Sequence, residues 1–423
     1  MAFQQGLSGL DASASQLNAI GNNIANASTV GFKSSTTQFS DIFASSLSSG
    51  NSSQIGIGTQ VSAVAQNFSQ GNIQSTGNSL DMAINGQGFY RMNNNGSISY
   101  SRNGQFQLDK NGYLVDAGGN QVTGYQASAS GVITTGNLAP LQIPTANLAP
   151  IATSTATIGL NLNSSSTVPT TTPFNPTDPT SFNNSTSMTV YDSLGNSHVA
   201  TLYFSLASPT PAAVTTAGGT AAWNTYLTMD GTAVPAANTP IGTLGFNASG
   251  TMVYPPAGTL KMGQIPVTDT LTNGANPLNM TLDFSSTTQY GSPFGVNQLV
   301  QNGYTSGQLS GFATSPTGII QGNYSNGQSK NLGQIALVNF ADPQALQSAG
   351  NNQWAETNAS GAALVGAPSS GNLGSIQSGA TESSNVNLTS ELVNMITAQR
   401  NYQANAQTIK TEDQITQTIV NLR

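Results

Sequence analysis

The chain has 423 residues, of which only 6% are charged, and its net charge is −7 at pH 7. Typical soluble proteins carry about 25% charged residues, so this chain takes its polarity from Ser, Thr, Asn, Gln and Gly. Its nine Lys and Arg residues are scattered, which excludes the cation cluster that neutralises nucleic acid phosphates. The lack of Cys excludes disulfides and thiolate metal sites.

The N-terminal segment repeats apolar residues at alternating steps of four and three. The repeat consists of Phe3, Leu7, Leu10, Ala14, Leu17, Gly21 and Ile24. A seven-residue apolar repeat is the seam of a coiled coil, so it predicts a helix that packs against other helices. The segment has neither the basic start nor the apolar core of a secretory signal peptide. No run approaches the ~18 apolar residues of a membrane span, so we expect no membrane insertion.

The stretch GNNIANASTVGFKSS, residues 21–35, follows this repeat directly. It is rich in Asn, Gly and Ser, which suits either a ligand-binding loop or the end of a helix. The next regular pattern lies in residues 86–125, where Asn95-Gly96, Asn103-Gly104 and Asn111-Gly112 recur every eight residues. Asn-Gly is the strongest two-residue hairpin signal, so this segment predicts a β-meander.

Proline separates the centre of the chain from its flanks. No Pro precedes Pro140, and sixteen of the nineteen lie between Pro140 and Pro293. Short apolar strands such as SMTVYD and HVATLYF alternate there with Ser/Thr/Pro loops, and strands with Asn-Gly turns return in residues 304–345. We therefore expect a mixed α and β fold, mainly β, in which a central β-domain is inserted into another β-domain.

The expected domain boundaries follow from these patterns. They are a terminal helical domain (1–30 and 380–423), an extended connector (31–71 and 369–379), a discontinuous first β-domain (72–144 and 300–368), and an inserted Pro-rich outer β-domain or domains (145–299).

The C-terminal segment carries a second apolar repeat. It runs through Leu388, Leu392, Met395, Tyr402, Ala406 and Ile409, and continues with a small phase shift through Ile415, Ile419 and Leu422. Asn387 is the expected N-cap of a helix over residues 388–422, with Glu391 in its first turn and Arg423 at its other end. The two terminal helices need a partner. An intramolecular pair that covers the β core and an assembly with neighbouring chains both satisfy that need.

Candidate catalytic and metal-binding groups are sparse. The single His198 follows Asp192 across a Gly195-Asn196 turn, and a polar hairpin end explains it better than a metal or acid–base pair. The twelve Asp are scattered and the four Glu all follow residue 355, so no carboxylate pair suggests glycoside hydrolysis. Trp223 and Trp354 are expected in cores rather than at a sugar site. We therefore expect no enzyme, catalytic residue, cofactor or metal.

Three segments together carry a resemblance to the bacterial flagellar rod and hook axial protein family. LNAIGNNIANASTVGFKSS resembles the N-terminal signature of that family, and LDMAINGQGFYRMNNNGSISYSRNGQFQLDKNGYLV resembles its first β-domain. SNVNLTSELVNMITAQRNYQANAQTIKTEDQITQTIVNLR resembles the C-terminal end of its hook and distal rod members. The chain length and the large insert are most similar to the hook members.

The resemblance implies a structural subunit of the bacterial flagellar hook. Such a subunit polymerises with copies of itself into a curved, flexible tube that acts as a universal joint, transmits motor torque from rod to filament and encloses the export channel. Its partners are the rod, hook cap and hook–filament junction proteins. It is exported by the flagellar type III apparatus without a cleaved signal peptide, so its place is extracellular, in the hook and basal body.

The same resemblance, read onto the repeats, implies the assembly residues. They are Leu7, Leu10, Leu17, Ile24, Leu388, Leu392, Met395, Tyr402, Ile409 and Ile419. The stretch 21–35 becomes a helix end and hinge, in which Gly31 and Phe32 belong to the motif and Asn22, Asn23 and Asn26 are candidates for hydrogen bonds between subunits. Two alternatives remain open: a rigid distal rod-like subunit, and a secreted β-rich adhesin or carbohydrate-binding module.

Overall fold

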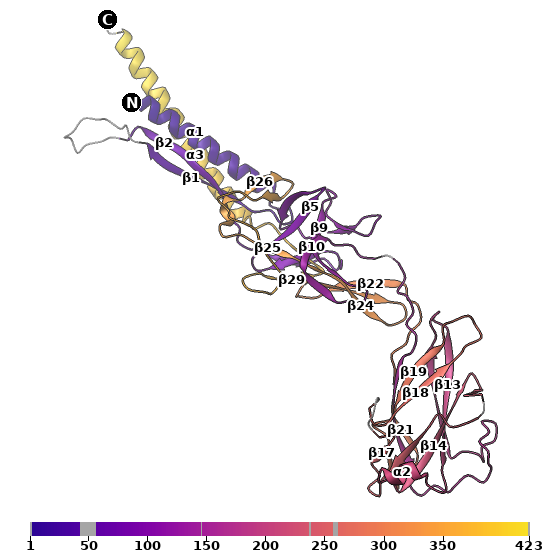
Figure 1. The fold of residues 1–423 in the computed structure, drawn as a ribbon. Coiled ribbons are helices and arrows are strands. Elements are labelled where there is room, and N and C mark those ends of the chain that lie inside the picture. The colour runs from indigo at the N-terminus through magenta and orange to yellow at the C-terminus, as the bar shows by residue number, and fades with distance from the viewer. Residues whose placement is uncertain (1, 43–55, 145, 237, 257–260, 422–423) are drawn as a thin grey trace. The chain divides into compact units, whose positions relative to one another are not determined.

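The computed structural model describes residues 2–42, 56–144, 146–236, 238–256 and 261–421. The described chain is mainly β, with a long helix at each end (Figure 1). It divides into unit 1, which comprises Met1–Thr145, Ser310–Asn323 and Ser329–Arg423, and unit 2, which comprises Ala146–Leu309 and Tyr324–Gln328. The expected fold class, with terminal helices and nested β-domains, is confirmed. The finer division of unit 1 into three domains stays a prediction.

The terminal helices are α1 (Ala2–Ala25) and α3 (Leu388–Asn421). Asn387 caps α3 as expected, because its side-chain Oδ1 accepts a hydrogen bond from Ser390 N at 3.1 Å. The expected role of Arg423 at the far end lies outside the described residues. None of the described helices is long and apolar enough to cross a membrane.

Unit 1 holds the β structure next to the helices. Its strands are β1 (Ser35–Ile42), β2 (Gly58–Gln66), β3 (Ile73–Ser75), β4 (Met82–Asn85), β5 (Phe89–Asn94), β6 (Ser97–Ser101), β7 (Gln107–Leu108), β8 (Leu114–Val115), β9 (Gln121–Ala127), β10 (Ile133–Pro140), β22 (Leu309–Thr314), β23 (Ile319–Tyr324), β24 (Ser329–Ile335), β25 (Leu337–Asn339), β26 (Gln347–Gly350), β27 (Gln353–Ala355), β28 (Leu364–Gly366), β29 (Ser375–Ser378) and β30 (Ala380–Glu382), with a 3-10 turn at Pro343–Ala345. Strands from both sides of the insert share one sheet, since β24 pairs with β9 and β25 with β5.

The Asn-Gly turns behave differently from one another. Asn95 and Gly96 have positive φ and close the β5–β6 hairpin, as expected. Gly112, also with positive φ, lies in the turn between β7 and β8. The expected hairpin at Asn103-Gly104 is wrong: β6 pairs with β5 and β27, not with β7. Gly104 instead lies against the backbone of Met82, whose oxygen would be 1.6 Å from an added Cβ. Here glycine permits a close approach of two chain segments.

Unit 2 is a β-sandwich. Its elements are β11 (Thr155–Asn163), β12 (Asn184–Tyr191), β13 (Ser197–Leu206), α2 (Ala212–Thr216), β14 (Ala221–Met229), β15 (Thr232–Val234), β16 (Gly242–Phe246), β17 (Met252–Tyr254), β18 (Gln264–Asp269), β19 (Leu278–Asp283), β20 (Thr288–Tyr290) and β21 (Gly295–Gln301). One sheet has the order β18-β19-β11-β20 with β21 on β11, and the other β12-β13-β14-β16-β17 with β15 on β14.

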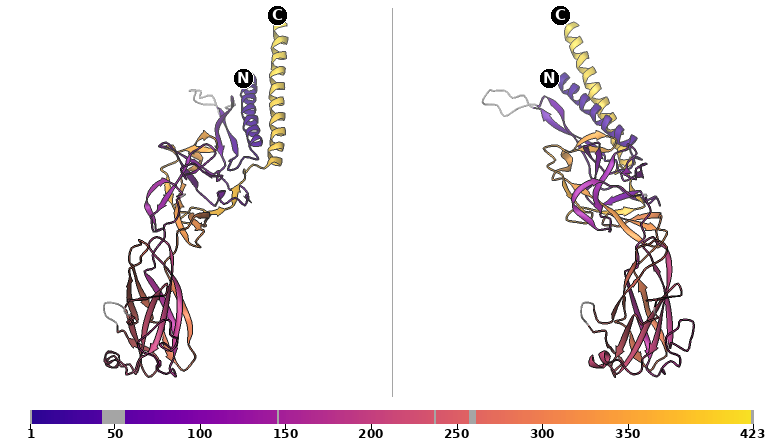
Figure 2. Two further views of the ribbon diagram at one scale, coloured as in Figure 1. Left: turned by 90° about the vertical axis from the view of Figure 1, so that its right-hand side faces the viewer. Right: turned by 45° about the vertical axis from the view of Figure 1, so that its right-hand side comes forward.

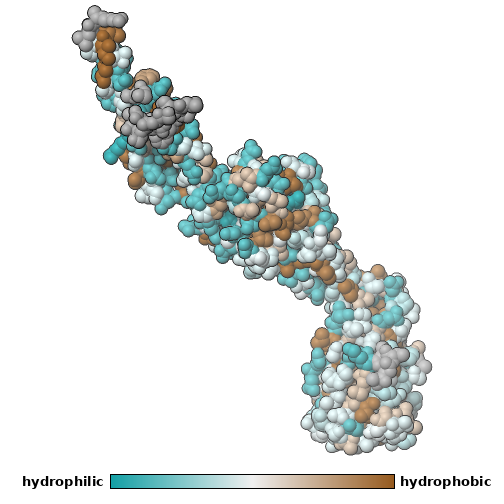
Figure 3. All heavy atoms as spheres, turned by 60° about the vertical axis from the view of Figure 1, so that its left-hand side comes forward, coloured by the Kyte–Doolittle hydropathy of each residue, from teal (hydrophilic) through white to brown (hydrophobic). Residues whose placement is uncertain are grey.

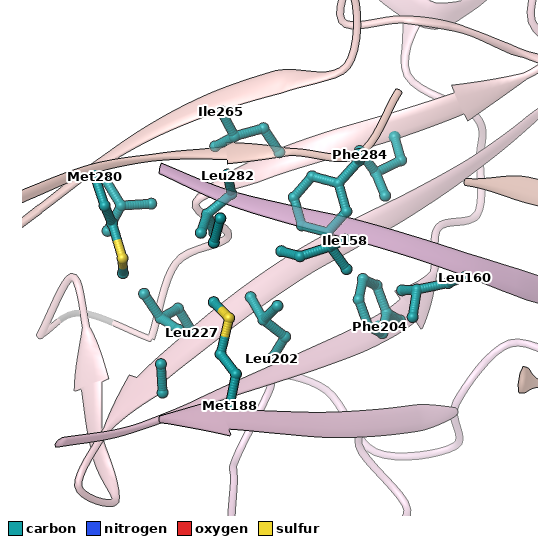
Figure 4. Packing of buried hydrophobic residues seen from close by; sticks show 14 of the residues in the cluster. Ile158, Leu160, Met188, Leu202, Phe204, Leu227, Ile265, Met280, Leu282 and Phe284 are labelled. Atoms are coloured by element: carbon teal, nitrogen blue, oxygen red, sulfur yellow. The ribbon is translucent and has the colours of Figure 1, made fainter. Parts of the chain in front are cut away.

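The two sheets of unit 2 enclose one apolar core. Ile158 and Leu282 come from the first sheet and Leu202 and Phe204 from the second, and all four are fully buried (Figure 4). Alternating inward-facing residues of both sheets build such a core. Trp223 belongs to it, while Trp354 lies in a separate aromatic cluster of unit 1. Both tryptophans are therefore core residues, as expected.

Candidate assembly site

The helix pair of unit 1 approaches closely at the small residues Gly6 and Gly9. A Cβ placed on Gly6 would lie 3.0 Å from Ile409 Cγ1, and one placed on Gly9 would lie 2.8 Å from the Asn405 side chain. As the residue number rises in α1 it falls in α3, so the helices are antiparallel, and Figures 1 and 2 show them side by side. Small residues permit this close approach, and Ser13 is buried beside them.

The leucine repeat of α1 is only partly covered by its own chain. We call its residues Phe3, Leu7, Leu10, Ala14, Leu17, Gly21 and Ile24 the outer stripe. Phe3 and Leu7 are 49% and 45% exposed, and Leu10, Leu17 and Ile24 are half-buried. Exposed apolar residues on one face of a helix are typical of surfaces that contact another molecule.

Most of the expected assembly residues of α3 are also exposed to solvent. Leu388, Leu392, Tyr402 and Ile419 are exposed, whereas Met395 and Ile409 are half-buried. Val393, Ile396, Ile415 and Val420 are further exposed apolar residues of the same helix. Ala398 is the one residue of α3 that is buried among those described.

The stretch that follows α1 is a helix end, which settles the question that residues 21–35 posed. Asn23 is 1% exposed, and its amide donates to Ser35 O at 2.8 Å and accepts from Ser35 N at 2.9 Å. It therefore ties the end of α1 to the start of β1, and is buried within its own chain. Asn22 is exposed, and Asn26 donates to its backbone and side-chain oxygens. Bonds between subunits stay a prediction for these two.

Gly31 lies in the turn between α1 and β1. Its φ is +72°, and an added Cβ would lie 2.7 Å from Asn103 N, so both conformation and space require glycine. Its N–H donates to Glu382 O at 2.8 Å. Phe32 N donates to Thr29 O and completes the turn. The motif thus fastens the N-terminal segment to the C-terminal one.

Beneath this turn lies a buried charge cluster that sequence reasoning missed. Lys33 Nζ is 2.7 Å from Glu382 Oε1, and Arg102 Nε is 3.1 Å from Glu382 Oε2. The three side chains are at most 4% exposed. We call them the Lys33–Glu382–Arg102 cluster. In a chain with so few charges, the isolated Lys33 in GFKSS and Glu382 shortly before α3 were the only available signals.

Hydrogen bonds complete the cluster. Lys33 Nζ also donates to Ser69 O, Gly71 N donates to Glu382 Oε1, and Arg102 donates to the carbonyls of Gly86 and Gly88. Burial is the main influence on the pKa of Lys33 and lowers it, with Arg102 acting in the same direction and Glu382 opposing. Burial likewise lowers the pKa of Arg102. One carboxylate thus holds three distant chain segments at the base of the helices.

His198 lies in unit 2 at the β12–β13 turn, as expected of a hairpin end. It faces two carboxylates: Nδ1 is 2.6 Å from Asp230 Oδ2 and Nε2 is 3.3 Å from Asp192 Oδ2. Asp230, on the turn after β14, was not anticipated. Burial lowers the pKa of His198, but the hydrogen bonds to Asp230 and Asp192 outweigh it and raise the pKa. Among the described residues no group of His, Asp and Glu could hold a metal ion.

Comparison with protein-family models matches four segments of the chain. Residues 3–33 match the flagella basal body rod protein, 83–165 the flagellar hook protein FlgE/F/G D1 domain, 161–304 the flagellar basal body protein FlaE D2 domain, and 377–422 the flagellar basal body rod FlgEFG protein C-terminal region. The outer stripe and the exposed residues of α3 fall in the two terminal matches.

Curated relatives and one solved structure agree with these models. The chain is 45% identical to the flagellar hook protein FlgE of Salmonella typhimurium over 430 residues, and 30% identical to that of Borreliella burgdorferi over 453 residues, with at least 99% of each chain covered. The crystal structure of Helicobacter pylori flagellar hook protein FlgE2 matches 72% of this chain and 99% of its own with a TM-score of 0.50 at 16% identity, which shows a shared fold. The chain belongs to the flagellar hook protein FlgE family.

Proposed function

We propose that this chain is the subunit of the flagellar hook and polymerises with copies of itself through its two terminal helices. One observation carries the proposal: α1 and α3 already pack against each other within the chain, yet Phe3 and Leu7 of the outer stripe and Leu392 of α3 remain exposed. Burying one Leu or Ile contributes about 1.5–3 kcal/mol, so many such residues per subunit favour a polymer. The names of the relatives support the same role.

Introducing a charge into the apolar surface tests the proposal. Leu10→Asp or Leu392→Asp would place an unpaired carboxylate in the interface, so we expect no tubes in electron micrographs at concentrations where the parent chain forms them. Circular dichroism should show unchanged β structure. The matched controls Asn18→Asp and Gln403→Asp add the same charge at exposed polar positions and should still form tubes. Normal tubes from both leucine variants would contradict the proposal.

The wider role rests on the family. We infer a structural and not an enzymatic role in the flagellum, as a curved tube that transmits torque from rod to filament and encloses the export channel. The inferred partners are the rod, hook cap and junction proteins and the type III export apparatus, which would export the chain without cleaving a signal peptide. An intact N-terminal Met1 or Ala2 on protein recovered from isolated hooks would support this route, and a cleaved one would contradict it.

Flexibility of the tube is a further part of the proposal. Unit 2 carries few charges, and its exposed Ser, Thr and Asn side chains can make weak, interchangeable contacts with neighbouring copies. Such contacts are compatible with sliding when a tube bends. Crosslinks between neighbouring copies of unit 2 should therefore stiffen the tube, and tubes that bend equally well after crosslinking would contradict the idea.

A further inference from the structure

A groove of about 470 Å³ lies where α1, α3 and the β1–β2 hairpin of unit 1 meet. Its walls include Gln16 and Ser13 of α1, Phe39 of β1, Thr59 of β2 and Ala404 of α3. Phe39 is 43% exposed although its ring is apolar. A water molecule occupies about 30 Å³, so the groove has room for whole side chains. No lining residue carries a charge.

Within the described residues, the C-terminal end of α3 extends past the start of α1. Gly6 lies opposite Ile409, and α1 starts four residues before Gly6, so its first residue is level with about residue 413 of α3. The helix continues to Asn421 beyond that level, as Figures 1 and 2 show. Ile415 and Ile419 are 49% and 63% exposed there, and Val420 is exposed beside them. Figure 3 shows hydrophobic residues on this protruding end.

The groove and the protruding end match in chemistry. Both are uncharged, since Gln414–Asn421 reads QITQTIVN, and both combine apolar side chains with amides and hydroxyls. The groove also continues the α1–α3 contact, where Gly9 and Asn405 already meet. We propose that the groove of one subunit receives Ile415, Ile419 and Val420 of a second copy. This inference rests on the proposed function and names the contact through which part of the polymer forms.

Geometry excludes the chain's own end as the occupant. Ile419 lies fourteen residues after Asn405 on one continuous helix, which corresponds to about 21 Å at 1.5 Å per residue. A disulfide requires Cα atoms within about 7 Å of each other. Since the native chain has no Cys, an engineered disulfide between the groove and residue 419 can form only between two subunits.

Mixed disulfide crosslinking tests the inference. One tagged chain carries Ile419→Cys and a second, differently tagged chain carries Gln16→Cys in the groove. They are mixed, polymerised where the parent chain forms tubes, oxidised and resolved on a non-reducing gel. The matched control replaces Gln16→Cys with Asn18→Cys, an exposed position two residues along α1 that does not line the groove. We expect the crosslinked heterodimer to be at least tenfold more abundant with Gln16→Cys.

Each other result has a defined meaning. Equal crosslinking of both positions in intact tubes would overturn the groove contact and leave the proposed function standing. A third arm with Leu7→Cys in place of Ile419→Cys asks whether the outer stripe fills the groove instead, and preferential crosslinking there would also overturn the inference. If the parent chain itself forms no tubes, the proposed function fails and the groove contact fails with it.

A second variant covers the case in which the Cys chains do not polymerise. Ile419→Ala removes most of the apolar side chain without adding a reactive group, and residue 419 is exposed, so the monomer should fold normally. We expect the critical concentration for polymerisation to rise about tenfold or more, since a buried Ile contributes on that scale. An unchanged critical concentration would overturn the inference.

Discussion

Glu382 is the single carboxylate between two buried cations, and the free energy of unfolding of unit 1 should depend on its charge. Glu382→Gln leaves Lys33 and Arg102 buried without a counter-charge. Breaking a buried ion pair from one side costs about 3–5 kcal/mol, so we expect a loss of that size. Denaturant unfolding followed by Trp354 fluorescence in a Trp223→Phe background measures it.

Glu412→Gln is the control for this substitution, because Glu412 is only half-buried on α3 and lies outside the cluster. Its effect should stay within about 0.5 kcal/mol. Equal stabilities for the two variants would show that the cluster contributes nothing net.

His198 should make the stability of unit 2 depend on pH. Both ring nitrogens face carboxylates, so the doubly protonated ring fits the site and the pKa of His198 is raised. Its contribution is fully present below the ordinary His pKa of about 6.5 and is lost as pH rises through the raised folded-state pKa. We therefore expect the denaturation midpoint of unit 2 to fall as pH rises above about 6.5.

The carboxylates give the opposite dependence at acidic pH. Burial raises the pKa of Asp192, but hydrogen bonds from Asn196, Asn273 and His198 lower it well below its usual range. The stability that the ionised carboxylate gives unit 2 is fully present above the ordinary Asp pKa of about 3.9 and is lost on acidification. In His198→Gln the denaturation midpoint of unit 2 should no longer change with pH near neutrality. Its decrease at acidic pH should remain. A neutral-pH slope that persists in His198→Gln would assign it to another group.

At the scale of the elements, replacing a glycine of α1 should disturb the contact with α3 only where that glycine lies against α3. Gly9→Val would press a branched side chain into Asn405, whose atoms lie 2.8–2.9 Å from an added Cβ. Overpacking of this kind costs about 1–3 kcal/mol. We expect faster hydrogen exchange of the α3 amides in the monomer.

Gly21→Ala on the same helix is the matched comparison, because no atom lies within 4 Å of an added Cβ there. Ala favours a helix over Gly by about 1 kcal/mol, so exchange in α1 should slow. Equal effects of the two variants would mean that α1 and α3 do not pack through this face.

At the scale of the whole molecule, each unit has its own core and its own tryptophan. Trp223 lies in the core of unit 2 and Trp354 in an aromatic cluster of unit 1. Phe204→Ala removes a fully buried ring from the unit 2 core, which typically costs about 3–5 kcal/mol. We expect the unfolding transition seen by Trp223 to shift and that seen by Trp354 to remain.

Single-tryptophan backgrounds separate the two signals, with Trp354→Phe for unit 2 and Trp223→Phe for unit 1. Val199→Ala, at an exposed position on the same strand as Phe204, should move neither transition. A joint shift of both transitions in Phe204→Ala would show that the units unfold as one.

Local chemistry made much of this fold predictable. The apolar repeats predicted α1 and α3, Asn387 predicted the start of α3, and Asn95-Gly96 predicted the β5–β6 turn. Each of these signals depends only on a few neighbouring residues, so the sequence alone is enough to identify it. The long motifs at both ends also sufficed to indicate the family, since they extend over dozens of residues.

Only the tertiary structure determined the contacts between residues that lie far apart in the sequence. Only the folded chain brings Lys33 to Glu382, 349 positions away, and Asp230 to His198. The heptad identified the outer stripe, but not that Gly6 and Gly9 would lie in the contact with α3 and that Phe3 and Leu7 would stay exposed. A periodic pattern determines which residues share a face of a helix, whereas the partner of each face depends on the shape of the surrounding elements.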